Sequence, residues 1–152
     1  MPLFTLTGAD TLIINNRVIR NMANNDISVL TYSANIADKS TGRSGNTIIS
    51  KNESGNNGDL TLRLMRGSGD DIFLQSLLTQ QNDVNFSTFV LLTGQLVKNL
   101  GDGLGNSLQD VYALTGGFFS KQVDVTTNVQ GSTEQGVAVY HIGWSRVART
   151  QQ

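Results

Sequence analysis

The sequence offers few side chains that could do chemistry. His141 is the only histidine, and the chain has no cysteine. Thiolate zinc sites, iron–sulfur clusters, cysteine nucleophiles and metal sites built from a pair of histidines are therefore excluded. A Ser-His-Asp triad would need His141 beside an acid and a nucleophile, but its neighbours alternate between apolar and polar as in a strand. We interpret His141 as a structural or surface residue.

Two further motifs have both a chemical and a structural interpretation. Asp70 and Asp71 could ligate a metal ion, but they directly precede an apolar helical pattern, where acidic side chains stabilise the helix dipole. Residues 101–106 are rich in glycine, yet they lack the Lys-Ser/Thr of a P-loop and the closing glutamate of a calcium loop. We interpret them as a hairpin turn. The sequence thus predicts no catalytic residue, cofactor or metal.

The composition argues against nucleic-acid and membrane binding. The 152 residues include 11 Lys and Arg against 12 Asp and Glu, so duplex DNA or an anionic membrane would find no basic footprint. The longest apolar runs, residues 89–92 and 137–140, are far shorter than the ~20 residues of a membrane-spanning helix. The N-terminus lacks a signal-peptide pattern, so we expect folding in a cytoplasm. Charged residues are only 15%, which suggests that much of the surface does not face bulk water.

The elements that would position these residues are mainly short β-strands separated by Gly, Asn and Asp. Leu60, Leu62 and Leu64 alternate with polar residues, which is the pattern of a strand with one buried face. We predict strands at residues 12–14, 18–19, 28–33, 47–50, 60–65, 87–97, 108–119, 120–129 and 136–147. In the last of these, Ala138, Tyr140, Ile142 and Trp144 are expected to share one face, and Val137, Val139, His141 and Ser145 the other.

One helix is predicted at residues 70–81, between the two halves of the β pattern. Apolar residues recur there at helical spacing, beginning with Ile72, and Phe73, Leu74, Leu77 and Leu78 are expected to pack on the sheet. The predicted fold is therefore an antiparallel β-sandwich or barrel-like structure with one flanking α-helix. Residues 1–152 show no linker that would divide them, so we expect a single domain.

A long polar segment at residues 38–59 interrupts this pattern. Unstructured loops of this length are uncommon in compact domains unless they have a function. The segment is interpreted either as a flexible surface loop or as an arm that becomes ordered against a neighbouring subunit. The residues that would make the contact in an arm are Lys39, Arg43, Asn46, Ile48, Ile49, Lys51 and Glu53.

The order of these segments resembles the tail tube protein of contractile-tailed bacteriophages (myoviruses). The resemblance runs from about residue 9 to residue 144. It rests on the N-terminal strand pair, the polar segment and the alternating strand that leads through Arg66-Gly67-Ser68-Gly69-Asp70-Asp71 into a leucine-rich helix. A long hairpin then precedes Lys121-Gln122-Val123 and Glu134-Gln135-Gly136-Val137-Ala138-Val139-Tyr140.

This resemblance implies a structural virion protein rather than an enzyme, similar in fold to the haemolysin-coregulated protein of type VI secretion. Six subunits would form a ring, and rings would stack helically into a tube inside the contractile sheath of the phage tail. The implied partners are further copies of the chain, the sheath protein, and baseplate and tail-terminator proteins, with assembly in the host bacterial cytoplasm. Genomic DNA would pass through the channel during ejection without specific binding.

The channel wall itself should present polar side chains at every second position of a strand. In residues 120–129, Val123 and Val125 would face the core, whereas Gln122, Asp124 and Thr126 would face the channel. The alternative is that these three side chains face outer solvent or the sheath.

Three other functions remain open from the sequence. The chain could be a tube subunit of a related contractile injection system, or a baseplate or head–tail accessory protein of the same fold. A small carbohydrate-binding β module is a third possibility. It would need an exposed aromatic platform, whereas aromatic residues are only 7% of this chain and lie mostly in apolar runs.

Overall fold

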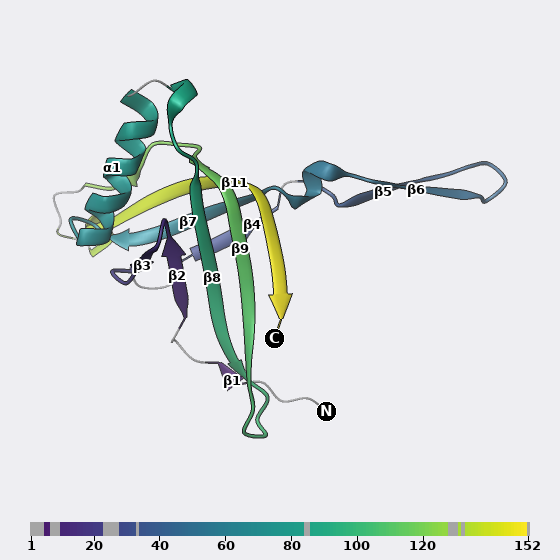
Figure 1. Cartoon of the computed structure of the whole chain (residues 1–152), viewed down its shortest axis with the longest axis horizontal. Helices are drawn as coiled ribbons and strands as arrows, with labels where there is room; N and C mark the ends of the chain where they lie inside the picture. Colours follow the sequence, from purple (N-terminus) through teal and green to yellow (C-terminus); the bar gives the residue numbers. More distant parts are fainter. Residues whose placement is uncertain are drawn as a thin grey trace.

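The computed structural model describes residues 5–6, 10–22, 28–32, 34–83, 86–127, 131 and 133–151. In these residues the chain forms a strongly curved antiparallel sheet with an α-helix packed against it and a thin two-stranded ribbon projecting from it (Figure 1). The predicted mainly β, barrel-like fold with one helix is confirmed. None of the described helices is long and apolar enough to cross a membrane.

The main sheet has the strand order β3-β2-β8-β9-β11-β7-β4. Two short strands extend it, because β1 pairs with β8 and β10 pairs with β11. The strands are β1 (Thr5–Leu6), β2 (Thr11–Ile14), β3 (Arg17–Ile19), β4 (Ser28–Thr31), β7 (Gly58–Met65), β8 (Leu92–Gly101), β9 (Ser107–Phe119), β10 (Asp124–Val125) and β11 (Val137–Gln151). The 3-10 helices are η1 (Glu53–Asn56), η2 (Phe86–Thr88) and η3 (Thr133–Gly136).

The turn between β2 and β3 follows directly from its two residues. Asn15 and Asn16 have φ angles of 50° and 67°, and asparagine is one of the few residues other than glycine that adopts this conformation readily. The Asn15 side chain also accepts a hydrogen bond from the Thr93 amide at 3.0 Å. The hairpin is therefore fixed to the beginning of β8.

Alternating residues of the central strands build the core. Leu60, Leu62 and Leu64 of β7 are buried, as are Ala138, Tyr140, Ile142 and Trp144 of β11, and both predicted alternations are confirmed. The Trp144 ring packs against Gly117 of β9, where an added Cβ would lie 2.4 Å from the ring. Gly117 is thus required for the indole to enter the core.

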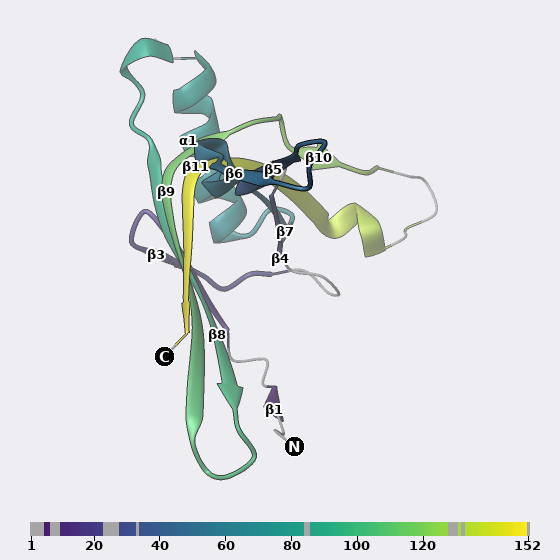
Figure 2. The ribbon, with the colours of Figure 1, turned by 90° about the vertical axis from the view of Figure 1, so that its right-hand side faces the viewer.

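The long strand β11 joins the two halves of the sheet. It pairs with β7 from Val137 to Trp144 and with β9 from Ile142 to Gln151 (Figure 2). The β9–β11 register is the same on both sides of Gly116, which has a φ of 65° and lies between the pairs Trp144–Gly117 and Arg146–Thr115. The irregularity lies on the other side of β9, where the β8–β9 register shifts between Leu92 and Gly94. The next buried residue of β11 after Trp144 is Val147.

Helix α1 (Gly69–Asp83) packs its apolar stripe on the sheet, as predicted. Leu74 and Leu78 are buried, and Phe73 and Leu77 pack against the core while partly exposed. The Gln81 side chain fastens the end of the helix to the end of β9, because its amide accepts from the Phe119 N–H at 2.8 Å and donates to the Phe119 carbonyl at 2.9 Å. Ile72 belongs to the same sequence pattern but is 65% exposed.

Two predicted strands are shorter than expected. The strand predicted to begin at residue 87 begins at Leu92, after the 3-10 helix η2. The strand predicted at residues 120–129 is reduced to the two residues of β10, and its last two residues, 128 and 129, lie outside the described part. Val123 packs against the core as expected, but Val125 is 49% exposed, so its predicted burial is wrong.

Candidate assembly surfaces

His141 contacts an acid but does not form a nucleophilic triad. Its Nε2 lies 2.7 Å from Asp124 Oδ2. The Ser120 hydroxyl donates to the main-chain carbonyl of His141 and not to its ring. Among the described residues, no group of three His, Asp or Glu side chains could hold a metal ion. The His141–Asp124 pair instead links β11 to β10.

Asp70 has a larger structural role than the helix-dipole interpretation suggested. Its side chain is 2% exposed and accepts hydrogen bonds from Arg17 Nε at 2.9 Å and from the backbone amides of Arg20 and Asn21 at 2.7 and 2.8 Å. Burial alone would raise the pKa of this carboxyl, but the two amides and the Arg17 guanidinium outweigh it and lower the pKa below its usual value. Asp70 thereby clamps the start of α1 to the end of β3.

Asp71 forms a second attachment of the same helix. The Tyr140 hydroxyl donates to the Asp71 carboxylate and to its carbonyl oxygen, and the Gly67 amide donates to the carboxylate at 2.8 Å. Burial and the neighbouring carboxylate raise the pKa of Tyr140. Asp70 and Asp71 thus attach the start of α1 at two points: Asp70 binds the end of β3, and Asp71 binds Tyr140 of β11.

The polar segment predicted at residues 38–59 contains an ordered β-hairpin, which we call the arm. Among the strands that the structure describes, β5 (Ala37–Thr41) and β6 (Thr47–Lys51) pair only with each other, and they project from the body of the molecule (Figures 1 and 2). All ten of their residues are exposed. The rest of the predicted segment forms η1 and the beginning of β7. The arm-contact residues predicted from the sequence lie on β5 (Lys39), in the turn (Arg43, Asn46), on β6 (Ile48, Ile49, Lys51) and at the start of η1 (Glu53).

The base of the arm is held tightly. The Asn52 amide donates to the Ile36 carbonyl at 2.8 Å, just beyond the last pair of the hairpin. Gly55 of η1 lies so close to this point that an added Cβ would be 2.5 Å from the Asn35 carbonyl oxygen. The arm therefore leaves the body in a defined direction.

Pairing within the arm separates its charges onto two faces. Residues opposite each other in an antiparallel pair point to the same side, and Lys39 is opposite Ile49. Lys51 lies two residues from Ile49 and so shares its face. We call this the basic face; it consists of Ala37, Lys39, Thr41, Thr47, Ile49 and Lys51. The other, acidic face consists of Asp38, Ser40, Ile48 and Ser50.

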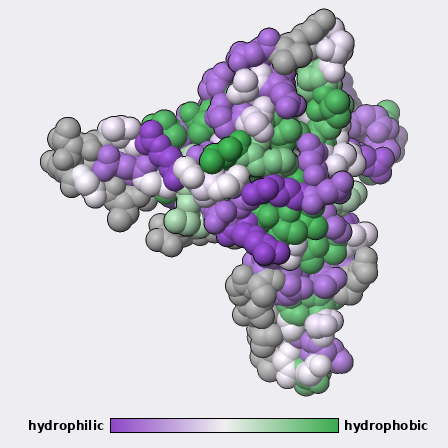
Figure 3. Space-filling model, turned by 60° about the vertical axis from the view of Figure 1, so that its left-hand side comes forward, coloured by the Kyte–Doolittle hydropathy of each residue, from purple (hydrophilic) through white to green (hydrophobic). Residues whose placement is uncertain are grey.

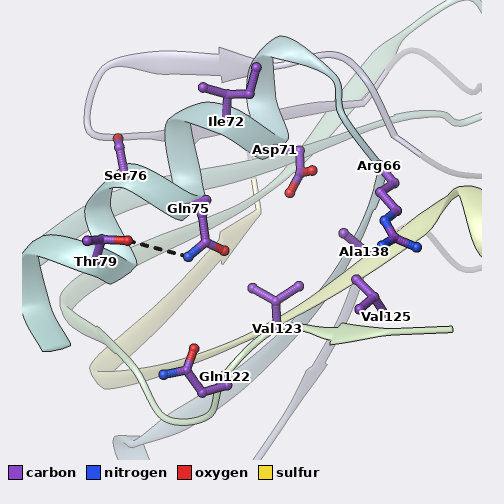
Figure 4. A pocket seen from close by; sticks show the side chains of 10 residues that line it. All are labelled: Arg66, Asp71, Ile72, Gln75, Ser76, Thr79, Gln122, Val123, Val125 and Ala138. Carbon is purple, nitrogen blue, oxygen red and sulfur yellow. Dashed lines mark hydrogen bonds between the residues drawn. The ribbon is translucent and has the colours of Figure 1, made fainter. Parts of the chain in front are cut away.

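A groove runs between α1 and the segment that contains β10, with a volume of about 670 Å³ (Figure 4). Helix residues Asp71, Ile72, Gln75, Ser76 and Thr79 form one wall, and Gln122, Val123, Val125, Ala138 and Arg66 form the remainder. Hydrophobic areas lie among hydrophilic ones on the side of the molecule that carries α1 (Figure 3). Sequence reasoning missed this groove; the exposed Ile72 in the first turn of the helix was its only local signal.

The structure does not bring the three predicted channel residues onto one face. Gln122 lines the groove beside α1. Asp124 lies on the opposite side of β10 from Val125 and binds His141. Thr126 is exposed, and its carbonyl accepts a hydrogen bond from Arg66 at 3.4 Å. Their orientation toward a channel stays a prediction, and of the three only Asp124 lies on a strand.

The outer face of the main sheet is polar but carries little charge where β8, β9 and β11 run together. Gln95, Ala113 and Ala148 are aligned across the three strands, and Thr115 is paired with Arg146. Asn99 and Gln109 are paired further along the hairpin.

No family model and no curated protein matches this chain. Its fold is similar to a chain of the sheath–tube complex of an extracellular contractile injection system, PVC, in the extended state. The TM-score is 0.62 at 11% identity, covering 93% of this chain and 87% of that one. A chain of the sheath/tube terminator of PVC is similar with a TM-score of 0.59 at 12% identity, covering 93% of this chain and 92% of that one. The predicted likeness to contractile tail tubes is thereby confirmed at the level of the fold.

Proposed function

We propose that this chain is a structural subunit of the inner tube of a contractile tail-like machine. The observation that carries the proposal is the arm, an ordered hairpin whose strand residues are all exposed and which, within the described part of the chain, pairs with no other strand. Such a projection has a physical role when it reaches another subunit. A fold similar to chains of a contractile injection system supports the same role.

In this proposal, subunits form hexameric rings that stack. A ring-to-ring contact is head-to-tail, and a head-to-tail contact that does not close produces a filament. The arm residues Lys39, Ile49 and Lys51 would bridge from one subunit to the next. Further partners would be a sheath protein, a terminator and a baseplate. The protein would act as scaffold and conduit and not as an enzyme.

The channel would be lined by the outer face of the main sheet, with Asp124 as a contributing carboxylate. The Asp124 carboxylate would repel a passing polyanion, and the uncharged side chains would not attract it, which leaves Arg146 as the basic side chain named on this face. The electrostatic effect is screened beyond about 8 Å at physiological salt. In a phage tail the passing polymer would be genomic DNA, and the tube would be part of the virion. In an injection machine it would be another cargo.

The injection-machine tube is the second candidate, and the likeness to two PVC chains favours it. The terminator likeness equally allows an accessory role at the end of a tube. These candidates share the ring and differ in stacking, because a terminator ends a tube whereas a tube subunit extends it.

Electron microscopy of the purified full-length chain tests the proposal. Rings that stack into tubes of uniform bore are expected as the protein concentration rises. Rings that never stack would favour the terminator role. A monomer at every concentration, with no ordered assembly, would overturn the proposal.

A further inference from the structure

We propose that the groove between α1 and β10 receives the basic face of the arm of a second copy of this chain. The inference rests on the proposed function and adds the surface to which the arm binds. Both partners are present on every subunit, so each copy would offer its arm to one neighbour and its groove to another.

The arm presents one chemically distinct face. Ile49 is 75% exposed, lies opposite Lys39 and is flanked on its own strand by Lys51. An apolar side chain between two ammonium groups, of which Lys51 also contacts the exposed Glu53 at 3.3 Å, fits a surface that is apolar in the middle and acidic around it. Ile48, which is 72% exposed, points to the acidic face beside Asp38. The two adjacent isoleucines therefore cannot enter the same groove together.

The groove supplies the complementary surface. Ile72, Val123, Val125 and Ala138 provide its apolar lining, and both Ile72 and Val125 are well exposed to solvent. Helix α1 contains Asp70, Asp71 and Asp83 and no Lys or Arg. Asp70 is neutralised by Arg17. The negative charge of the groove wall is therefore Asp71, whose carboxylate also accepts from Tyr140 and Gly67, and Asp83 adds an exposed carboxylate at the end of the helix, beyond the groove lining.

Arg66 is the basic residue of the groove, and it is already engaged. Its Nη1 lies 3.3–3.4 Å from the Thr126 carbonyl, the Thr127 hydroxyl and the Gln135 carbonyl. It therefore points along the β10 side of the groove (Figure 4). The helix wall opposite stays free of positive charge and suits Lys39 and Lys51.

The dimensions also match. Helix α1 has 15 residues and so a length of about 22 Å, whereas each arm strand has 5 residues and spans about 17 Å. The ribbon can thus lie along the helix over most of its length. Because the arm projects away from α1 (Figure 1), a subunit does not fill its own groove.

Cysteine cross-linking tests the contact, since the chain has no cysteine of its own. The variant Ile49→Cys/Gln75→Cys places one thiol on the basic face and one in the groove wall. The matched control is Ile48→Cys/Gln75→Cys, which moves the arm thiol to the adjacent residue on the opposite face. After mild oxidation of assembled protein, we expect a ladder of covalent oligomers for the first variant and at least about tenfold less for the control.

Single substitutions provide a second measurement that needs no oxidation. Ile49→Ser should raise the concentration required for half-assembly at least about tenfold, because it removes a buried isoleucine from the contact. Ile48→Ser should leave that concentration within about twofold.

The possible outcomes separate the inference from the proposed function. Rings or tubes in which the Ile49 pair fails to cross-link, or in which Ile48→Ser is the more damaging change, would show that the arm binds elsewhere and would overturn the inference alone. Failure of the unmodified protein to form rings or tubes would overturn the proposed function and the inference together.

Discussion

Arg17 Nε lies 2.9 Å from Asp70 Oδ1, and this contact joins the edge strand β3 to the first turn of α1 across 53 positions of sequence. The carboxylate is almost completely buried, whereas the Arg17 side chain is 44% exposed. The arginine can therefore regain water if the pair is broken, but the backbone amides of Arg20 and Asn21 would lose their charged acceptor. Asp70 is thus the more sensitive member of the pair.

Replacing this carboxylate should destabilise the fold. Asp70→Asn keeps the shape but removes the charge that accepts from three residues, and hydrogen bonds to charged groups contribute about 1.5–3 kcal/mol each. We expect the free energy of unfolding to fall by at least about 1.5 kcal/mol in urea denaturation. Asp38→Asn on the exposed arm is the control and should change it by less than about 0.5 kcal/mol. Equal effects would contradict the clamp.

Lowering the pH should destabilise the fold, because it protonates the Asp70 carboxylate. The pKa of Asp70 is lowered in the fold, and the Arg149 guanidinium, which donates to both oxygens of Asp110, lowers the pKa of Asp110 as well. Their stabilisation is fully present above the unfolded carboxyl pKa of about 3.9 and is lost as the pH falls through the lower folded values. Melting temperatures of the native protein and Asp70→Asn should therefore converge on acidification below about pH 4. A constant difference down to pH 2 would contradict this.

Helix α1 offers a test that separates core from surface. Leu74→Ala removes a fully buried side chain and should cost about 2–5 kcal/mol of unfolding free energy. Leu77→Ala should cost less, because Leu77 is only partly buried. Ile72→Ala should cost less than about 0.5 kcal/mol in the isolated subunit while weakening assembly through the groove. A loss at Ile72 as large as that at Leu74 would mean that Ile72 supports the core.

Shortening the arm should prevent assembly without preventing the body of the protein from folding. Deletion of residues 44–51 removes β6, which pairs only with β5, so the main sheet keeps all its pairing. We expect an unchanged far-ultraviolet circular dichroism spectrum for the body and a melting temperature within a few degrees. Electron microscopy should then show no tubes. Full-length tubes from this variant would remove the arm from the assembly contact.

Asp124 provides the test of the channel. Asp124→Lys would place a positive charge on each subunit near His141, and a ring of such charges would retain a polyanion. We expect normal tubes with slowed passage of cargo in assembled particles. Unchanged passage through intact tubes would assign Asp124 to the outer surface.

Local sequence patterns predicted the elements whose burial is decided within one strand or one turn. The alternation of Leu60, Leu62 and Leu64 and the strands predicted at residues 12–14 and 18–19 are examples. The Asp70 clamp could not be predicted, because its partners lie 49–53 positions away and no local pattern brings them together. The sequence shows that residue 70 is acidic, but it does not show that the Asp70 side chain is buried.

The strand predicted at residues 120–129 failed for a different reason. Its alternation of valine with polar residues is a genuine β pattern, but a strand also needs a free edge to pair with. Strand β9 occupies that edge of β11 from Ile142 onward, so β10 finds partners only at Ala138 and Val139. In the arm, conversely, Ala37–Thr41 has little apolar content, and only its pairing with β6 makes it a strand.

The arm's attachment also determines how force would travel between neighbouring subunits. A pull on the ribbon passes along the backbone through η1 into β7, and the Asn52–Ile36 hydrogen bond and the close approach at Gly55 hold the two chain segments together at the base of the arm. A filament joined in this way would consist of rigid subunit bodies connected by thin hairpins. Bending would then be concentrated in the hairpins, while the bore of each ring would keep its shape.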